Sequence, residues 1–366
     1  MKVGFYSPLP PARTGVADYS AALLPALSAL CRVEMDSANA DVCLYHLGNN
    51  QLHAAIYQQA LARPGVAVLH DATLHHMLLG LLDRQAYVEE FVYNYGDFHR
   101  QQGARLWDAR RQSAHDPAYF EHALVRRIGE VSCAVVVHNP AAARIVRQHA
   151  PGARVAEIPH LFAPPALPPR EESLRWRAGR GIAEDTFLFG VFGHLRESKR
   201  LHSILRAFER VRRTGADAAL LVAGDFVSPE LERALGPLLA APNALRVPFC
   251  AEPEFWNIAS AVDACINLRD PSAGETSGIA IRLMGIGKPV FLSAGDETAC
   301  IPPGAALRVD RGLAEESALV EYMVWLRAHP EMARQIGARA AAHVAAHHSL
   351  AGAARSYAEL LFSCCP

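Results

Sequence analysis

Short apolar runs alternate with amphipathic helical patterns along most of the chain, and this alternation is typical of βαβ units that build parallel sheets. The first half of the chain contains five such runs, at Lys2–Ser7, Val42–His46, Val66–His70, Ala134–His138 and Arg154–Ile158. A second series occupies residues 186–193, Ala219–Ala223, Leu245–Pro248, Ala264–Leu268 and Pro289–Leu292. The pattern therefore predicts an α/β fold with two parallel sheets.

A proline-rich stretch separates the two series. Closely spaced prolines break regular structure between residues 159 and 184, and no strand pattern continues there. We therefore predict an N-terminal Rossmann-like domain over residues 1–165 and a C-terminal Rossmann-like domain over residues 166–345. A helix over residues 346–366 is expected to pack back on the N-terminal domain. Residues 72–130 are too long for a simple crossover, so we expect a helical insertion there.

The composition is that of a globular protein without a strong charge. With 366 residues the chain is long enough for two cores, and its net charge of −1 at pH 7 argues against a nucleic-acid partner. The eight cysteines include no C-x-x-C pair, which favours reduced cysteines over disulfides or a metal site. The N-terminus has no apolar signal segment, and no run is long enough to span a membrane. We therefore expect a cytoplasmic protein, with contact at the inner face of the membrane as an option.

A glycine-flanked turn, Gly274–Gly278, carries one carboxylate, Glu275, and precedes a short helix. Glycines let a backbone approach a ligand closely, and the first N–H groups of a helix are available to bind oxygen atoms. Arg269 adds a cation at the end of the preceding strand. Glu275 would then hydrogen-bond sugar or ribose hydroxyls. The alternative is that Glu275 only caps the helix, a role worth about 1 kcal/mol.

A second strand–loop–helix turn lies at Gly193–Arg200. It holds three fixed cations, Arg196, Lys199 and Arg200, and it leads into a helix N-terminus, so it would suit a phosphate or diphosphate. The turn is neither a G-x-G-x-x-G fingerprint nor a P-loop, and a solvated charged loop is the alternative. Two polar clusters at the carboxyl ends of strands in one domain favour the ligand interpretation.

In the first half, His70 and Asp71 follow an apolar run, and His75 and His76 come soon after. A histidine at the carboxyl end of a parallel strand is well placed to face a cleft, so His70 is a candidate site residue. The alternative is a hydrogen-bonded histidine at a strand end. The spacings from His70 to His75 and His76 do not place two imidazoles squarely on one helical face, so we expect no metal site.

Two further strand ends carry polar residues. Gly15 would let backbone amides approach a phosphate or an acceptor, and the alternative is a plain turn capped by Thr14. His138 ends another run, and Asn139 followed by Pro140 is explained by a helix N-cap and a first helical residue. We therefore assign His138 only a minor part in any site.

Together these residues resemble the GT-B glycosyltransferases of the large retaining group called family 4, or glycosyl transferases group 1. The resemblance covers nearly the whole chain and is most specific at the Gly-Lys-Pro-Val segment, residues 287–290, with Glu275 upstream. Individually weaker matches are the opening segment 7–20, the G-x5-K turn from Gly193 to Lys199, and Leu220–Gly224. The resemblance implies two Rossmann-like domains that face each other across a cleft. The C-terminal domain would hold most of the donor and the N-terminal domain most of the acceptor.

The resemblance also implies a role for each matched residue. His70 matches a histidine that faces the transferred sugar, and Glu275 matches the first Glu of an E-x7-E pattern, near the donor sugar. Lys199 matches a lysine that neutralises the departing diphosphate. We therefore expect catalytic roles for His70, Glu275 and Lys199. The predicted donor-binding residues are Gly15, Gly193, His194, Arg196, Lys199, Arg200, Arg269, Glu275, Thr276, Ser277 and Gly278, with no metal ligand.

Two positions depart from the family pattern. His194 stands where an arginine is usual, so either Arg196 or Arg200 compensates or the contact is lost. The second Glu of the pattern, normally a ribose ligand, aligns with Arg282 at a spacing one residue shorter. No D-x-D occurs in the chain, which agrees with metal-independent transfer.

The predicted function is retaining, metal-independent transfer of a hexose from a nucleotide-diphospho-sugar to a glycan or lipid-linked glycan, in polysaccharide biosynthesis. The donor is GDP- or UDP-linked, general resemblance favours mannose, and no separate cofactor is expected. The arginine- and aromatic-rich insertion would bind an anionic acceptor or a membrane surface, with a solvated helical face as the alternative. A nucleotide-sugar-binding pseudo-enzyme or partner protein is the rival function, supported by His194 and Arg282. A sugar-nucleotide epimerase is a third option, but its acid–base residues are not evident.

Overall fold

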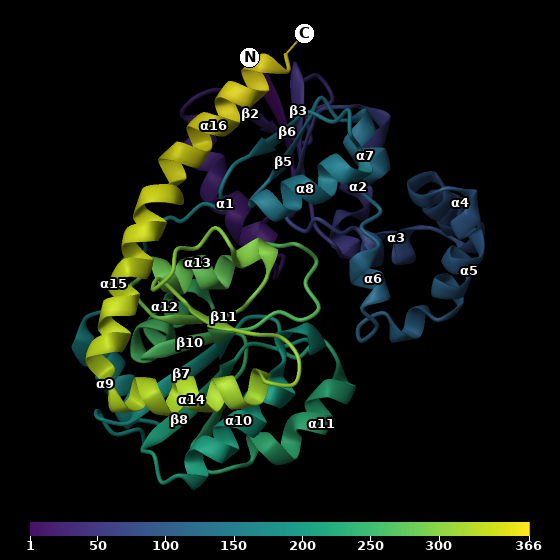
Figure 1. Cartoon of the computed structure of the whole chain (residues 1–366). Helices are drawn as coiled ribbons and strands as arrows, with labels where there is room; N and C mark the ends of the chain where they lie inside the picture. Colours follow the sequence, from purple (N-terminus) through teal and green to yellow (C-terminus); the bar gives the residue numbers. More distant parts are fainter. Residues whose placement is uncertain (366) are drawn as a thin grey trace. The chain divides into compact units, whose positions relative to one another are not determined.

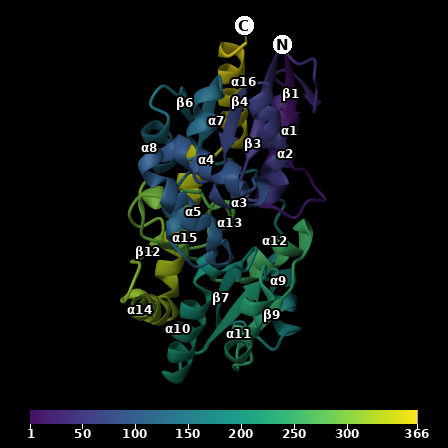
Figure 2. The ribbon, with the colours of Figure 1, turned by 90° about the vertical axis from the view of Figure 1, so that its right-hand side faces the viewer.

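The computed structural model describes residues 1–365, whose contacts divide the chain into two compact units (Figures 1 and 2). The first unit contains residues 1–163, the short segment Pro271–Gly278, and the chain from His348 onward. The second unit contains Pro164–Asp270 and Ile279–His347. Each unit is built on one six-stranded parallel sheet with helices around it, so the predicted α/β fold with two parallel sheets is confirmed.

The sheet of the first unit has the strand order β2-β1-β3-β4-β5-β6, and all neighbouring strands are parallel. Strands β3, β4 and β5 are buried along their whole length, as expected for parallel strands that are covered on both faces. The strands are β1 (Lys2–Tyr6), β2 (Arg32–Met35), β3 (Val42–Leu47), β4 (Val66–Leu69), β5 (Ala134–Val137) and β6 (Val155–Glu157).

The C-terminal helix packs against the first helix of the chain within the first unit (Figure 1). The hydroxyl groups of Tyr19 and Tyr357 form a buried hydrogen bond of 2.9 Å between these two helices. Helix α1 begins where the Thr14 side chain accepts a hydrogen bond from the Val16 N–H, a normal N-cap. The helices that flank this sheet are α1 (Gly15–Ser28), α2 (Ala54–Ala62), α8 (Pro140–His149) and α16 (Leu350–Ser363).

The predicted helical insertion is present between β4 and β5. Its buried residues Tyr87, Phe91 and Tyr119 belong to the same apolar cluster as residues of β3, β4 and β5, so the insertion packs on one face of the sheet. His75 and His76 lie at the start of its first helix, where the Asn49 carboxamide oxygen accepts hydrogen bonds from the His76 and Met77 N–H groups. The insertion consists of α3 (His75–Leu81), α4 (Arg84–Tyr95), α5 (Arg100–Asp108), α6 (Ala118–Glu121) and α7 (Arg126–Val131).

The sheet of the second unit has the order β12-β11-β10-β7-β8-β9, again with parallel neighbours. Helices α10 and α14 pack side by side on it (Figure 2). The strands are β7 (Phe187–Phe192), β8 (Ala218–Ala223), β9 (Ala244–Val247), β10 (Ala264–Asn267), β11 (Val290–Ser293) and β12 (Leu307–Val309). The helices are α9 (Arg170–Ala178), α10 (Leu201–Arg213), α11 (Pro229–Leu239), α12 (Glu252–Ala261), α13 (Gly278–Gly285), α14 (Glu315–Ala328) and α15 (Pro330–His347).

Two edge strands, β2 and β12, have no counterpart among the predicted strands. β2 pairs only with β1, and none of its residues is fully buried, so its sequence lacks the apolar run of a central strand. β12 is three residues long and pairs only with β11. Edge strands are often short, and a strand of three residues such as β12 gives too short an apolar run to be recognised in the sequence.

The strand order of the second unit has the 3-2-1-4-5-6 pattern, in which ligands bind where the order reverses, beyond the carboxyl ends of the strands. That reversal lies between β7 and β10. The two predicted polar loops, Gly193–Arg200 and Arg269–Gly278, follow these two strands directly. The order of strands therefore brings the start of both loops to the one position in this sheet where a ligand crevice is expected.

The lysine of the Gly-Lys-Pro-Val segment has a structural role. Its ammonium group donates hydrogen bonds to the carbonyl oxygens of Ser260 and Val262, at 2.8 and 2.7 Å, at the C-terminal end of α12. Burial lowers the pKa of Lys288, Asp263 nearby opposes this shift and Arg177 adds to it, and the resulting pKa is about 8. The cation thus binds carbonyl groups that the helix leaves without an internal partner.

The lowered pKa of Lys288 predicts a pH-dependent stability. In the unfolded chain a lysine has a pKa near 10.4, so between about pH 8 and pH 10 the unfolded state binds a proton that the native state does not. The unfolding free energy of the wild type should therefore rise with pH in this interval relative to Lys288→Met, by at most about 3 kcal/mol. Urea denaturation of both proteins at several pH values measures the difference. A difference that stays constant or falls with pH would contradict the assignment.

Candidate functional site

The loop that follows β7 is held by contacts within the second unit. Gly193 has a φ of +90°, which only glycine adopts easily, and a side chain there would lie 3.5 Å from the Lys199 ammonium nitrogen. Lys199 is only 2% exposed, and its ammonium group donates a 2.5 Å hydrogen bond to the Phe192 carbonyl oxygen at the end of β7. The predicted Gly193 and Lys199 therefore lie together at the carboxyl end of the central strand, and His194 is half-buried beside them.

The two arginines of this loop differ in their surroundings. The Arg200 guanidinium pairs with the buried carboxylate of Glu315 at 2.9 Å, and Asp270 lies 4.0 Å from it. Arg196 is exposed, and its side chain makes no hydrogen bond or ion pair with any other residue in the range 1–365. Of the two residues predicted to compensate for His194, Arg196 is thus the one whose charge is available to a ligand, whereas Arg200 already has a carboxylate partner.

The loop after β10 begins in contact with the loop after β7. The Asp270 N–H donates to the Ser198 carbonyl oxygen at 2.8 Å, and the Arg269 N–H donates to the Ser293 hydroxyl at 2.9 Å, at the end of β11. The Arg269 guanidinium is partly buried and donates to the Leu268 carbonyl oxygen at 3.1 Å. The predicted Arg269 and Lys199 therefore share one edge of the second sheet.

Arg282 lies in an aromatic and acidic environment. Its guanidinium lies 4.1 Å from the ring centre of Phe255 and 4.4 Å from that of Trp256, and it pairs with Glu252 at 2.5 Å. These cation–π contacts and the ion pair hold the side chain, which is 18% exposed. Arg282 therefore has local partners for its charge on α12.

The turn that carries Glu275 belongs by its contacts to the first unit, although the sequence predicted it as part of the second domain. The Ala72 N–H donates to the Ala273 carbonyl oxygen at 2.8 Å, which ties the segment after His70 to the segment before Glu275. The Glu275 carboxylate accepts from the Ala273 N–H at 2.8 Å and from the Ser272 hydroxyl at 3.2 Å. The carboxylate is thus oriented by its own loop.

Asn139 holds this turn from the side. Its carboxamide nitrogen donates to the Gly274 carbonyl oxygen at 2.9 Å and to the Thr276 hydroxyl at 3.0 Å. Its carboxamide oxygen accepts from the Ala142 N–H at 2.8 Å and so caps α8. The N-cap predicted for Asn139 is correct but incomplete, because the same buried side chain also fixes the predicted site loop.

Two glycines of the turn have close neighbours. Gly274 has a φ of +75°, and a side chain there would meet the Ala72 methyl group at 2.8 Å. A side chain at Gly278 would lie 3.1 Å from the His160 ring nitrogen. The predicted residues Thr276, Ser277 and Gly278 are therefore packed against the first unit, where Ser277 is partly buried.

Four histidines lie in a row along the carboxyl edge of the first sheet. His46, His70 and His138 stand at the ends of β3, β4 and β5, which are neighbours in the sheet, and His160 follows β6. Successive ring centres lie 5.3, 4.9 and 5.6 Å apart, close to the spacing of strands in a sheet. The Tyr19 ring contacts all four. Every predicted strand from β3 to β5 ends in a histidine, and this was the signal in the sequence for the row.

Both ring nitrogens of the predicted catalytic His70 are engaged by other histidines. Its Nε2 lies 3.0 Å from His46 Nδ1, and its Nδ1 lies 3.2 Å from His138 Nε2. Burial holds the pKa of His70 and of His46 well below the usual value, and the neighbouring histidines lower both further. Burial likewise lowers the pKa of His138 to about 4. These rings are therefore neutral at pH 7.

The remaining predicted residues lie apart from this row. His75 points into the insertion, where its ring bonds the Tyr87 hydroxyl at 2.6 Å, and His76 contacts the Ser113 carbonyl oxygen at 3.0 Å. A side chain at Gly15 would meet no atom within 4 Å, so the space beside α1 is open there. Within residues 1–365, no group of three or more histidine, cysteine or acidic side chains is arranged to hold a metal ion.

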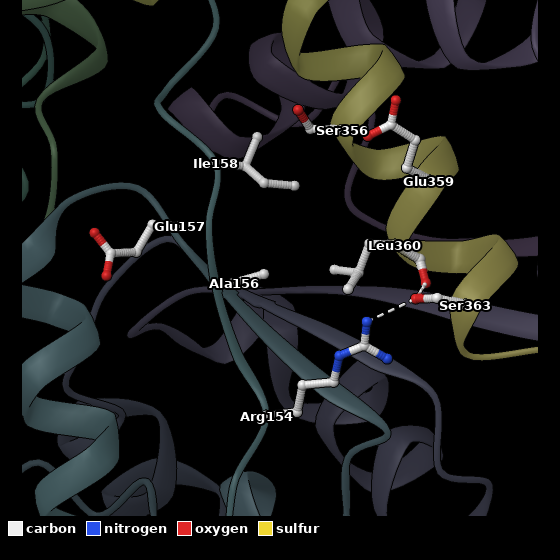
Figure 3. A pocket seen from close by; sticks show the side chains of 8 residues that line it. All are labelled: Arg154, Ala156, Glu157, Ile158, Ser356, Glu359, Leu360 and Ser363. Carbon is white, nitrogen blue, oxygen red and sulfur yellow. Dashed lines mark hydrogen bonds between the residues drawn. The ribbon is translucent and has the colours of Figure 1, made fainter.

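A shallow groove of about 330 Å³ lies elsewhere in the first unit, between the end of β6 and α16 (Figure 3). Arg154 crosses one end of it and donates to the Ser363 hydroxyl at 2.8 Å. Glu157 and Glu359 add carboxylates to its walls. None of the predicted site residues lines this groove, so it is separate from the loops described above.

Three solved structures superimpose on nearly the whole chain. HepE from Anabaena, solved with UDP and glucose, is 15% identical, with 99% of this chain and 100% of that one covered and a TM-score of 0.67. The chain has the GT-B fold. Sucrose-phosphate synthase from Thermosynechococcus elongatus is 16% identical, with 99% and 98% covered and a TM-score of 0.71. WaaG, a glycosyltransferase of lipopolysaccharide biosynthesis, is 14% identical, with 99% of each chain covered and a TM-score of 0.63.

At these identities the GT-B likeness concerns the fold alone. No protein-family model matches the sequence, and no curated protein matches it either. The GT-B structures of HepE were also solved with UDP-glucose and with UDP.

Asn139 caps α8 through its carboxamide oxygen and holds the Glu275 turn through its carboxamide nitrogen, so we expect substitutions to separate these two roles. Asn139→Asp keeps an oxygen for the Ala142 N–H but removes the donor to Gly274 and Thr276, whereas Asn139→Ala removes both. In hydrogen–deuterium exchange, Asn139→Asp should lose protection in residues 272–277 by roughly tenfold while α8 stays protected, since one buried hydrogen bond contributes about 1–2 kcal/mol. Asn139→Ala should lose protection in both. Unchanged exchange of residues 272–277 in Asn139→Asp would contradict the role.

Proposed function

We propose that the chain is a glycosyltransferase that moves a hexose from a nucleotide-diphospho-sugar to a glycan or lipid-linked glycan. The observation that supports this most directly is the position of the Gly193–Arg200 loop. It follows the central strand of a 3-2-1-4-5-6 sheet at the reversal of strand order, and it combines Arg196, Lys199 and the N-terminus of α10. A diphosphate is the ligand chemistry that fits such a loop.

In this proposal, protein cations stabilise the diphosphate leaving group. Lys199, Arg196 and the first N–H groups of α10 offset the charge that develops on the departing diphosphate. Transfer is then independent of a metal ion, because fixed protein charges supply the electrostatic stabilisation. Glu275 binds hydroxyl groups of the transferred sugar. Retention of configuration follows if a β-phosphate oxygen takes the acceptor proton on the face that the leaving group departs from.

UDP-glucose is the donor to test first, because HepE was solved with UDP-glucose and has the same fold. GDP-mannose is the second donor, from the sequence resemblance. The rival function, binding of a nucleotide sugar without turnover, is favoured by one observation: Arg282, at the position of the usual ribose ligand, is paired with Glu252. Donor binding without transfer or donor hydrolysis would select this rival.

A contact with a membrane surface is part of the proposal and concerns the insertion. Phe98 is 96% exposed in the short turn before α5, Arg105 is exposed on α5, and Arg111 is exposed just after this helix. Other arginines there are already neutralised, for example Arg100 by Glu89 and Asp97. Within residues 1–365 no helix is both long and apolar enough to cross a bilayer. Co-sedimentation with anionic vesicles tests the contact, and loss of binding in Phe98→Ser would support it.

Arg196 provides a sharp test of donor binding, because its side chain is exposed and has no structural partner to lose. In Arg196→Ala, kcat/KM for the donor should fall by roughly 10- to 100-fold, the worth of one charge-assisted hydrogen bond. The donor-induced rise in Tm should shrink accordingly. Arg213→Ala, which removes another exposed arginine of the same unit, is the matched control and should behave as the wild type. Full activity in Arg196→Ala would overturn the assignment of this loop to the diphosphate.

A further inference from the structure

The hydrogen bonds of the histidine row have only one consistent direction. His138 Nδ1 lies 2.8 Å from the Ile158 carbonyl oxygen, and a carbonyl oxygen only accepts, so His138 carries its proton on Nδ1. A neutral His138 then has a bare Nε2 that accepts. His70 must therefore donate from its Nδ1 to that nitrogen, 3.2 Å away.

The same reasoning extends along the row. A neutral His70 with a proton on Nδ1 has a bare Nε2, so His46 Nδ1 donates to it over 3.0 Å. His46 Nε2 is then bare, and it is in fact buried without a hydrogen-bond partner among residues 1–365. A bare ring nitrogen in an apolar environment costs less than a buried N–H without an acceptor. The unpartnered atom therefore lies where the direction of the row predicts it.

The opposite direction fails on charge. If His70 donated from Nε2 to His46, its Nδ1 would have to accept from His138 Nε2, and His138 would carry protons on both nitrogens. That places an imidazolium in a buried row, beside His46, His70, His160 and His348, where burial already lowers the pKa of His138 to about 4. His53 also lies near the row and donates from Nδ1 to the His46 carbonyl oxygen, but a histidine has no negative charge to offset an imidazolium.

We propose that His138 and His46 are positioning residues that fix the His70 ring through a one-way hydrogen-bond relay from the Ile158 carbonyl oxygen, with all three histidines as Nδ1–H tautomers. His70 Nε2 pairs with His46 and His70 Nδ1 pairs with His138, so both nitrogens of His70 are committed within the protein. His70 is thus held as an oriented, neutral ring beside the Glu275 turn, to which Ala72 connects it. A sugar hydroxyl that bonds the ring must first displace His46 or His138.

The tautomers can be read directly from long-range ¹H–¹⁵N spectra of the full chain labelled at histidine. In the wild type, His46, His70 and His138 should each show a protonated Nδ1 and a bare Nε2, although the Nε2–H form is usual for free histidine. This NMR measurement does not depend on whether the protein has transferase activity. An Nε2–H tautomer at any of the three histidines would overturn the relay.

Two matched substitutions test its direction. His138→Leu removes the residue that bonds the Ile158 carbonyl oxygen and accepts from His70. His70 and His46 should therefore both lose their exclusive Nδ1–H form. His46→Leu removes only the donor to His70 Nε2. His70 and His138 should therefore keep their Nδ1–H tautomers. Packing alone would not produce this asymmetry, and equal effects in both variants would contradict the proposal. If a variant does not fold, the wild-type spectra alone still decide.

The catalytic consequence rests on the proposed function, with His70 in the catalytic role predicted from the sequence, and it has a separate readout. His138→Leu should lower kcat by about tenfold to a hundredfold, the size typical of residues that orient a site ligand, with a smaller change in donor KM. If the relay tautomers are found but the wild type shows no transfer, the relay stands and the proposed function fails. If transfer occurs and His138→Leu keeps full kcat, His138 is not a positioning residue.

Discussion

Parallel strands all end at the same edge of their sheet, and this constraint decides where the chemistry of this protein lies. In the first unit it aligns the residues after β3, β4, β5 and β6, which are far apart in the sequence, at the spacing of neighbouring strands. Histidines at these positions therefore have neighbouring rings, and His70 lies within hydrogen-bond distance of both His46 and His138. In the second unit it brings the loops after β7 and β10 into contact through the Asp270–Ser198 hydrogen bond.

Much of the fold could be predicted from the sequence, because central parallel strands are buried on both faces and appear as uninterrupted apolar runs. Strands such as β4, with four buried residues, are visible in this way, and so is the helical stretch between β4 and β5. The edge strand β2 could not be seen, since none of its residues is fully buried. Pairing with β1 alone decides its conformation.

The candidate site was predictable as a set of loops but not as a set of contacts. Gly193, Lys199 and Glu275 were identified because glycine and charge follow apolar runs. The partners of these residues could not be identified, since Asn139 and Gly274 lie 135 positions apart. The pairing of Arg200 with Glu315 likewise joins residues 115 positions apart. His138 was assigned a minor role because each strand end was considered by itself, whereas its neighbours in the sheet determine what it does.

The position of residues 271–278 limits how the protein can be divided. The chain leaves the second unit at Asp270, packs in the first unit, and returns at Ile279. A fragment that begins at Pro164 would therefore retain Lys199 and Arg269. It would also contain Glu275, but it would lack Ala72 and Asn139, which hold the Glu275 segment in the full chain. Chimeras that exchange whole halves between proteins of this fold would place this segment against foreign residues at both anchoring points, Ala72 and Asn139. The boundary in sequence is thus simple, while the module that folds around Glu275 is drawn from three separate parts of the chain.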